Sequence, residues 1–146
     1  PPYPRKQNES LPKPPHLAML DLDFFKKIND NHGHDVGDMT LQEIAGIMNT
    51  SVIGYEGAQI GRWGGEEFFI LLPEMDEEKV MAFAERLRRA VDRHIFPHIG
   101  HLTISQGIIT VSGGGGLDRK AIYKAVDDAL YRAKEAGRNT IRKGTL

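Results

Sequence analysis

Four carboxylates, two near the end of one predicted strand and two at a predicted turn, are the side chains of this chain best placed to do chemistry. Asp21 and Asp23 end an apolar run, and Glu66 and Glu67 directly follow the pair Gly64–Gly65. Carboxylates that lie close together repel one another, which raises their pKa values unless a cation joins them. Their oxygens suit Mg²⁺ or Mn²⁺, which also take phosphate oxygens as ligands. If the turn lies beside the first strand, the four acids converge on a cation; otherwise they are separate solvated acids.

Basic and amide side chains elsewhere in the chain could bind a nucleotide. Lys26, Lys134 and Arg138 are candidate phosphate contacts, although each alone is typical of a solvated surface charge. Asn29 and Asp38 are a possible base-reading pair, because guanine offers N–H donors to a carboxylate and its O6 acceptor to an amide. The alternative roles of these two residues are a helix-end asparagine and a helix N-cap.

The sequence does not predict a standard nucleotide-binding loop or a histidine metal site. The chain contains neither GxxxxGK[ST] nor GxGxxG, and Gly113–Gly116 lacks a following Lys-Ser/Thr, so it is predicted to be a loop. Three histidines, His94, His98 and His101, have Pro97 between them, so they are not expected to share a helical face or bind a metal.

Strands and helices that would position these residues follow from the apolar periodicity. We expect a strand over 16–23, a helix over 24–31, a helix over 38–50, a hairpin over 60–72, a helix from N-cap Asp76 to before Pro97, a strand over 102–111 bent near Gly107, a helix ended by Gly137, and a short strand from Thr140. Glycines supply the positive φ of tight hairpin turns. Because the hairpin makes part of the sheet antiparallel, we predict an α+β sandwich with flanking helices, not a doubly wound parallel fold.

Length and composition narrow the function classes. The chain has 146 residues, enough for one domain, and its net charge of −1 argues against nucleic-acid binding or direct membrane contact. It has no cysteine and no apolar run of membrane-spanning length, which fits a cytoplasmic domain. The start without Met suggests a piece of a longer protein. Residues 1–15 hold six of the eight prolines and are predicted to be a linker or tail, with a PxxP ligand as the alternative.

Four segments, in order and at matching spacing, resemble the motifs of the GGDEF family of diguanylate cyclases. They are DLDFFKKINDNHGHDVGD (21–38), GRWGGEEF (61–68), LTISQG (102–107) and DDALYRAKEAGRN (127–139). Here the signature is its GGEEF variant. The resemblance implies that residues 16–146 adopt a fold like the nucleotidyl cyclase palm, with a ferredoxin-like core. It also implies condensation of two GTP molecules into cyclic di-GMP, with release of two pyrophosphates.

Carried over position by position, the resemblance also implies roles for individual residues. Two Mg²⁺ or Mn²⁺ ions per site would be held by Asp21, Glu66, Glu67 and the backbone carbonyl of Leu22. Guanine would be read by Asn29 and Asp38, with His34 nearby. The phosphates would be held by the backbone amides of Phe24 and Phe25 and by Lys26, Lys134 and Arg138. The implied catalytic residues are Glu66, Glu67 and Lys26, with Glu66 as the proton acceptor or its metal ligand.

Assembly and regulation are further implications of this resemblance. One site binds one GTP, so activity needs a two-fold homodimer, and an upstream sensory or receiver domain is expected. The alternatives are a catalytically silent GTP-binding regulatory module, which normally loses an acid or glycine kept here, and a pure interaction domain. The family's inhibitory R-x-x-D motif is replaced by Tyr55–Ala58, so no inhibitory site is expected. The usual D-x-L-T-G-L-x-N-R helix is missing from residues 1–16, and Gln106 stands where an apolar residue is usual.

Overall fold

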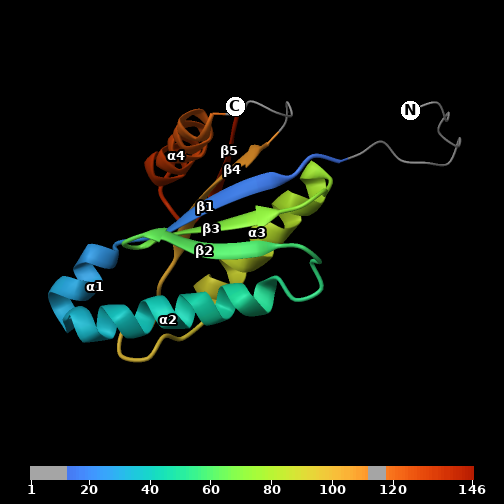
Figure 1. The fold of residues 1–146 in the computed structure, drawn as a ribbon. Helices are drawn as coiled ribbons and strands as arrows, with labels where there is room; N and C mark the ends of the chain where they lie inside the picture. The colour runs from blue at the N-terminus through green and yellow to red at the C-terminus, as the bar shows by residue number, and fades with distance from the viewer. Residues whose placement is uncertain (1–12, 112–117) are drawn as a thin grey trace, which may run out of the picture.

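A five-stranded sheet with helices on both faces forms the body of the molecule (Figure 1). The structure, a computed structural model, describes residues 13–111 and 118–146. Its elements are β1 (His16–Leu22), α1 (Phe25–His32), α2 (His34–Ser51), β2 (Gln59–Gly64), β3 (Glu67–Leu72), α3 (Glu77–Arg93), β4 (Ile104–Thr110), α4 (Arg119–Glu135) and β5 (Ile141–Gly144). The predicted Gly113–Gly116 loop and most of the predicted 1–15 linker lie outside the described residues.

The strand order is β2-β3-β1-β4-β5, which places β1 at the centre of the sheet. β1 pairs antiparallel with both β3 and β4, β2 pairs antiparallel with β3, and β4 pairs parallel with β5. All seven residues of β1 are buried, as expected for a strand covered on both faces. The predicted α+β architecture with a mainly antiparallel sheet is therefore confirmed.

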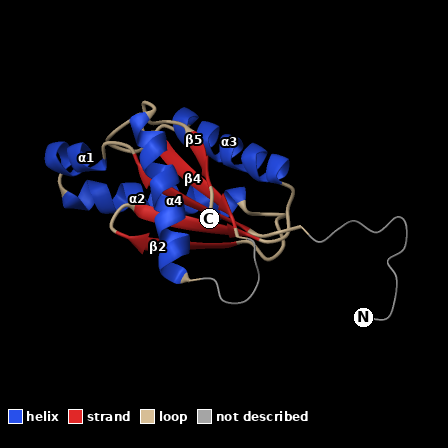
Figure 2. Ribbon diagram, turned by 90° about the horizontal axis from the view of Figure 1, so that it is seen from above, coloured by secondary structure: helices blue, strands red, loops and turns tan. Residues whose placement is uncertain are grey.

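Two apolar clusters fill the space on either side of the sheet, because successive residues of β1 point to opposite faces. Leu20 and Leu22 join the larger cluster with α2 and α3, whereas Leu17 and Met19 pack against α4. Figure 2 shows α4 lying across its face of the sheet. None of the helices within 13–111 and 118–146 combines the length and apolar character needed to cross a membrane.

Gly107 serves a purpose other than the predicted bend. The register between β1 and β4 runs without interruption through this residue. A Cβ placed on Gly107 would lie 2.4 Å from the amide nitrogen of Leu130 and 2.6 Å from the carbonyl oxygen of Val126. The glycine therefore lets the α4 backbone lie directly on β4, a position that helps to place the end of α4 beside β1.

One helix start differs from the prediction, and another agrees with it but lacks a side-chain cap bond. α2 begins at His34, not Asp38, because Gly33 adopts φ 85 and lets a new helix start at once. Asp38 therefore lies inside the helix and is not its N-cap. Asp76 does hold the N-cap position of α3, but its side chain makes no cap bond among the described residues and instead accepts from Nζ of Lys13 at 3.2 Å.

Candidate active site

The β2–β3 hairpin lies beside β1, as the sequence predicted. Asp21 of β1 is the register partner of Glu67, the first residue of β3. Gly64 also pairs with Glu67, so the two-residue loop is Gly65 and Glu66, one position later than predicted. Gly65 takes φ 51, which glycine adopts without strain. The shift places Glu66 in the turn itself, at the mouth of an open pocket of about 350 Å³ lined by Asp21, Gly64, Gly65, Glu66, Glu67 and Lys134.

Asp21 and Lys134 form an ion pair at the base of this pocket. Nζ of Lys134, near the end of α4, lies 2.5 Å from Oδ2 of Asp21. The other carboxylate oxygen, Oδ1, is buried and has no hydrogen-bond partner among the described residues. Burial works against the charge of Lys134, but its hydrogen bond with Asp21 and the negative charges around it outweigh that effect and raise its pKa. Lys134 is therefore held as a cation within the acidic group.

Glu66 and Glu67 lie in a field that disfavours their ionised forms. Burial, followed by repulsion from Asp21, raises the pKa of Glu66, while Lys134 partly offsets this effect. Burial and then the charges of Asp21 and Asp127 raise the pKa of Glu67. One lysine thus only partly neutralises the three acids of the pocket, and additional positive charge at this point would be stabilised.

The acidic pocket fits a divalent cation in its chemistry, although its side chains are not yet gathered around one. Among residues 13–111 and 118–146, no three His, Cys, Asp or Glu side chains are arranged to hold a metal ion. The unpartnered Oδ1 of Asp21 and the raised pKa values of Glu66 and Glu67 fit the chemistry of a cation site.

Asp23 does not join the other acids, contrary to the prediction that all four converge. Its carboxylate accepts from Oγ1 of Thr103 and from Oγ of Ser105, both at 2.7 Å, and from the backbone amide of Asn139 at 3.0 Å. These three bonds satisfy a side chain that is only 4% exposed. Asp23 therefore fastens the end of β1 to β4 and to the segment that follows α4.

Several predicted phosphate contacts meet where α1 begins. No side chain within the described residues caps this helix, and its first turn therefore offers backbone amides to an anion. Phe24 takes φ 58 at the N-cap position, and the Arg138 guanidinium lies over its ring at 4.6 Å. Phe25 is buried in the core, so only its backbone can contact a ligand, whereas Lys26 is exposed in the first turn.

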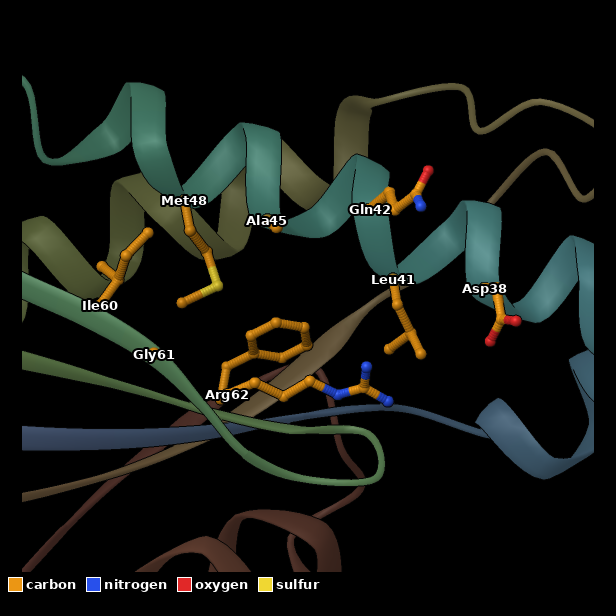
Figure 3. A pocket seen from close by; sticks show the side chains of 9 residues that line it. Asp38, Leu41, Gln42, Ala45, Met48, Ile60, Gly61 and Arg62 are labelled. Carbon is orange, nitrogen blue, oxygen red and sulfur yellow. The ribbon is translucent and has the colours of Figure 1, made fainter.

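A second pocket, of about 450 Å³, lies between α2 and the β2–β3 hairpin (Figure 3). Asp38 lies at one end, and the guanidinium of Arg62 extends toward that end beneath Leu41. The remaining lining is mostly apolar: Gln42, Ala45, Met48, Ile60, Gly61 and Phe68. A mostly apolar cavity with a carboxylate at one end suits a heterocyclic ring that carries N–H donors.

Arg62 was missed by the sequence reasoning. Its Nε donates to the backbone carbonyl of Gly65 at 2.7 Å, so it supports the turn as well as lining the pocket. The available signal was a long basic side chain in a strand, two residues before the glycine pair. That signal is weak, because an exposed arginine on an edge strand is common.

Asn29 and His34 do not line this pocket. Oδ1 of Asn29 is buried without a hydrogen-bond partner among the described residues, at the place where α1 meets α2. A Cβ on Gly37 would lie 1.9 Å from that oxygen, so glycine at this position gives the amide its room. Asn29 therefore meets α2 at the residue that precedes Asp38. His34 is exposed at the first residue of α2.

Two of the three departures from the family motifs, at Tyr55–Ala58 and at Gln106, have physical explanations. Tyr55 packs edge to face on Phe83 with ring centroids 5.1 Å apart, and its hydroxyl contacts Arg86, whose guanidinium also lies 5.6 Å from the Tyr55 ring. Gln106 is fully buried, and its Nε2 donates to the carbonyl oxygen of Ala84 in α3 at 2.9 Å. Gln106 therefore ties β4 to α3, which answers why a polar residue stands there.

Comparison with known proteins gives a consistent result over nearly the whole chain. The sequence model of the family described as "Diguanylate cyclase, GGDEF domain" matches residues 5–140. Diguanylate cyclase DgcM of Escherichia coli is 38% identical over 125 residues, which cover 86% of this chain and 30% of that protein. Response regulator PleD of Caulobacter vibrioides is 36% identical over 134 residues, or 88% of this chain and 29% of that protein. The chain thus spans under a third of the length of these relatives.

Solved structures show the same likeness in three dimensions. The active GGEEF domain of a diguanylate cyclase from Vibrio cholerae superposes with a TM-score of 0.80 at 34% sequence identity. The match covers 90% of this chain and 83% of that domain. The mixed sheet and its four helices are therefore shared with that domain.

Proposed function

The chain belongs to the GGDEF family of diguanylate cyclases, and we propose that it condenses two GTP molecules into cyclic di-GMP with release of two pyrophosphates. The observation that carries this proposal is the pairing of two unlike pockets on one hairpin. An acidic pocket with Asp21, Glu66 and Glu67 lies at the turn, and the ring-sized pocket with Asp38 lies between that hairpin and α2. A nucleoside triphosphate needs both kinds of surface.

The guanine ring is proposed to enter the pocket between α2 and β2. The Asp38 carboxylate would accept from N1–H and N2–H₂ of guanine, and the apolar floor formed by Leu41 and Phe68 would cover the ring. Adenine lacks these two donors, so the same pocket would discriminate against ATP. Asn29 would contribute to base recognition if its amide turns outward, with His34 near the pocket entrance.

The triphosphate is proposed to run from that pocket toward the start of α1. Backbone amides of Phe24 and Phe25 offer donors at an uncapped helix start, among the residues that the structure describes. The cationic side chains available there are Lys26, Lys134 and Arg138, of which Lys134 reaches Asp21 and Arg138 reaches Phe24. The phosphate chain would thus lie across the acidic pocket, where cations can bridge it to the carboxylates.

Asp21, Glu66, Glu67 and the backbone carbonyl of Leu22 are the proposed ligands for two Mg²⁺ or Mn²⁺ ions. When bound, such ions neutralise charge on the phosphates and lower the pKa of the attacking 3′-hydroxyl. Glu66 lies in the turn at the pocket mouth and is the carboxylate proposed to accept the proton of that hydroxyl or to ligate the metal beside it. Glu67 and Lys26 complete the proposed catalytic group.

Two copies of the domain are proposed to face one another, because each site holds one GTP and the product joins two. PleD, a relative at 36% identity, is named a response regulator, which supports an upstream receiver or sensory domain here as well. A cytoplasmic location is also proposed, because GTP is a cytoplasmic substrate. Residues 1–15 would be the connection to that upstream part, and residues 16–146 the catalytic domain.

A silent GTP-binding module is the second candidate, and a GTP incubation separates it from the enzyme. With GTP and Mg²⁺, chromatography should show cyclic di-GMP and pyrophosphate, with the rate rising more steeply than protein concentration where the domain dimerises. Glu66→Gln should abolish product while the domain still folds and unfolds cooperatively. If wild-type protein binds GTP in calorimetry but forms no product at any protein concentration, the silent module is the correct reading.

A further inference from the structure

Trp63 and Tyr123 form an aromatic contact between the β2–β3 hairpin and α4. Their ring centroids lie 5.1 Å apart and their planes differ by 24°, so the rings are stacked. Phe69 of β3 meets Trp63 edge to face at 5.9 Å and 86°. Aromatic pairs in these geometries attract one another beyond the burial of their area. Trp63 nevertheless stays 50% exposed, so core burial alone does not explain its position.

An irregularity in the hairpin register aims Trp63 at α4. Arg62 pairs with Phe68 and Gly64 pairs with Glu67, which leaves Trp63 as the extra residue on the β2 side. A bulge of this kind bends the strand and redirects the side chain at that point. Among the described strands, β2 is also an edge strand that pairs with β3 alone. Because the bulge directs Trp63 toward α4, the hairpin tip gains a side-chain contact outside the sheet.

Tyr123 belongs to the same face of α4 as Lys134. The spacing from Tyr123 to Asp127 and on to Lys134 is i, i+4, i+11, which keeps all three on one side of the helix. Burial, followed by the charges of Glu67 and Asp127, raises the pKa of Tyr123. The same helix also brings Lys134 to Asp21.

We propose that Trp63 and Tyr123 are positioning residues whose stack holds the turn Gly65–Glu66 against α4. The body of α4 packs on β4, β5 and β1, which fixes Lys134 relative to Asp21, and the β1–β3 ladder holds Glu67 beside Asp21, whereas Glu66 in the turn lies outside the described ladder pairs. The stack supplies a further constraint on the turn, and with it the spacing between Lys134 and Glu66. This inference rests on the proposed function where it is tested by the binding of a cation and a nucleotide. The test by amide hydrogen exchange does not depend on that function.

Amide hydrogen exchange of the hairpin tests the contact directly. In Trp63→Ala and Tyr123→Ala, exchange at Gly64 to Glu67 should become roughly three- to tenfold faster, the range expected for loss of one aromatic pair. The double variant should exchange no faster than either single one, because both remove the same contact. Tyr131→Ala is the matched control, since Tyr131 is on α4 but 62% exposed. Unchanged exchange at the turn, or an equal increase in Tyr131→Ala, would overturn the proposal.

Binding of Mn²⁺ with a non-hydrolysable GTP analogue distinguishes positioning from simple packing. Both alanine variants should need severalfold more Mn²⁺ for half saturation, and Trp63→Phe and Tyr123→Phe should restore most of the affinity. Trp63 is the single tryptophan of the chain, so its fluorescence should shift to longer wavelength in Tyr123→Ala. Alanine variants that are less stable yet bind Mn²⁺ and analogue as wild type would refute a positioning role. If wild type binds no analogue, the proposed function fails, and hydrogen exchange still decides this inference.

Discussion

Nζ of Lys134 lies 2.5 Å from Oδ2 of Asp21, so α4 supplies a positively charged side chain to the acidic pocket. The Asp21 side chain is 5% exposed and that of Lys134 is 33% exposed, which makes this a largely desolvated ion pair. In the proposed function Lys134 has two alternative partners, the Asp21 carboxylate in the free protein and phosphate oxygens once a triphosphate binds. That exchange of partners would free Asp21 for a metal ion at the moment the nucleotide arrives.

Lys134→Met is expected to weaken nucleotide binding without weakening metal binding. GTP analogue affinity should fall roughly ten- to a hundredfold, the loss expected for a charge-assisted hydrogen bond. Affinity for Mn²⁺ without nucleotide should stay equal or increase, because Asp21 is no longer neutralised. Calorimetry with each ligand separately measures both effects. Lys124→Met is the control, since Lys124 is 77% exposed on the same helix and pairs only with Asp128 within the described residues. A parallel loss of both affinities would show that Lys134 merely holds the acids in place.

The metal-free domain should lose stability from its glutamates as the pH rises. The pKa values of Glu66 and Glu67 are raised above their ordinary value of 4.5, so the folded state binds protons more tightly than the unfolded state. Their contribution to the free energy of unfolding is therefore most favourable below pH 4.5 and declines as the pH rises through the raised values. Mn²⁺ should accordingly stabilise the domain more at pH 7 than at pH 5.

Thermal unfolding of wild type and Glu66→Gln across pH, with and without Mn²⁺, measures this effect. The difference between the two proteins is the informative quantity, because other groups titrate in the same range. Burial lowers the pKa of His16, which makes its own contribution to stability increase with pH, opposite in sign to that of Glu66. A Glu66→Gln protein that matches wild type at every pH would contradict the predicted repulsion.

The sequence predicted those features that depend on strand periodicity and turn chemistry. The apolar run of β1 and the glycine pair predicted a central strand and a hairpin, and the acids were expected to converge if the two lay side by side; the pairing of Asp21 with Glu67 meets that condition. Features set by side-chain direction were not predictable in the same way. Asp23 follows the same alternation as Asp21, yet it turns to Thr103 and Ser105, since β4 presents two hydroxyls there. The role of Arg62 likewise depends on how far α2 stands from β2.

Asp38 is expected to determine the choice of base. Asp38→Ala removes the carboxylate at the end of the pocket and should weaken GTP binding roughly tenfold or more, while ATP binding stays equally weak. Gln42→Ala, an exposed residue that lines the same pocket, serves as the control and should change both affinities little. Competition calorimetry with GTP and ATP provides the comparison. An unchanged preference for GTP in Asp38→Ala would place the guanine elsewhere.

We expect that cyclic di-GMP does not inhibit the reaction by binding at the Tyr55–Ala58 segment. Tyr55 is occupied by contacts with Phe83 and Arg86, so this segment presents an aromatic ring where the family's inhibitory motif has an arginine. Initial rates of GTP turnover measured with increasing added cyclic di-GMP should therefore stay constant apart from competition at the active site. Noncompetitive inhibition by the product that Arg86→Ala removes would show that a binding site exists on this face after all.

Gln106 is expected to lower the free energy of unfolding of the domain through its unsatisfied side-chain oxygen. Its Nε2 reaches the carbonyl of Ala84, but its buried Oε1 has no hydrogen-bond partner among the described residues. Gln106→Met keeps the volume and removes the orphaned acceptor, so the free energy of unfolding should rise by up to about 1–2 kcal/mol or stay unchanged. Gln106→Ala leaves a cavity beside α3 and should destabilise the domain by about 2 kcal/mol or more. Urea unfolding of the three proteins compares them directly, and a Gln106→Met variant as unstable as Gln106→Ala would mean that the bond to Ala84 outweighs the unsatisfied oxygen.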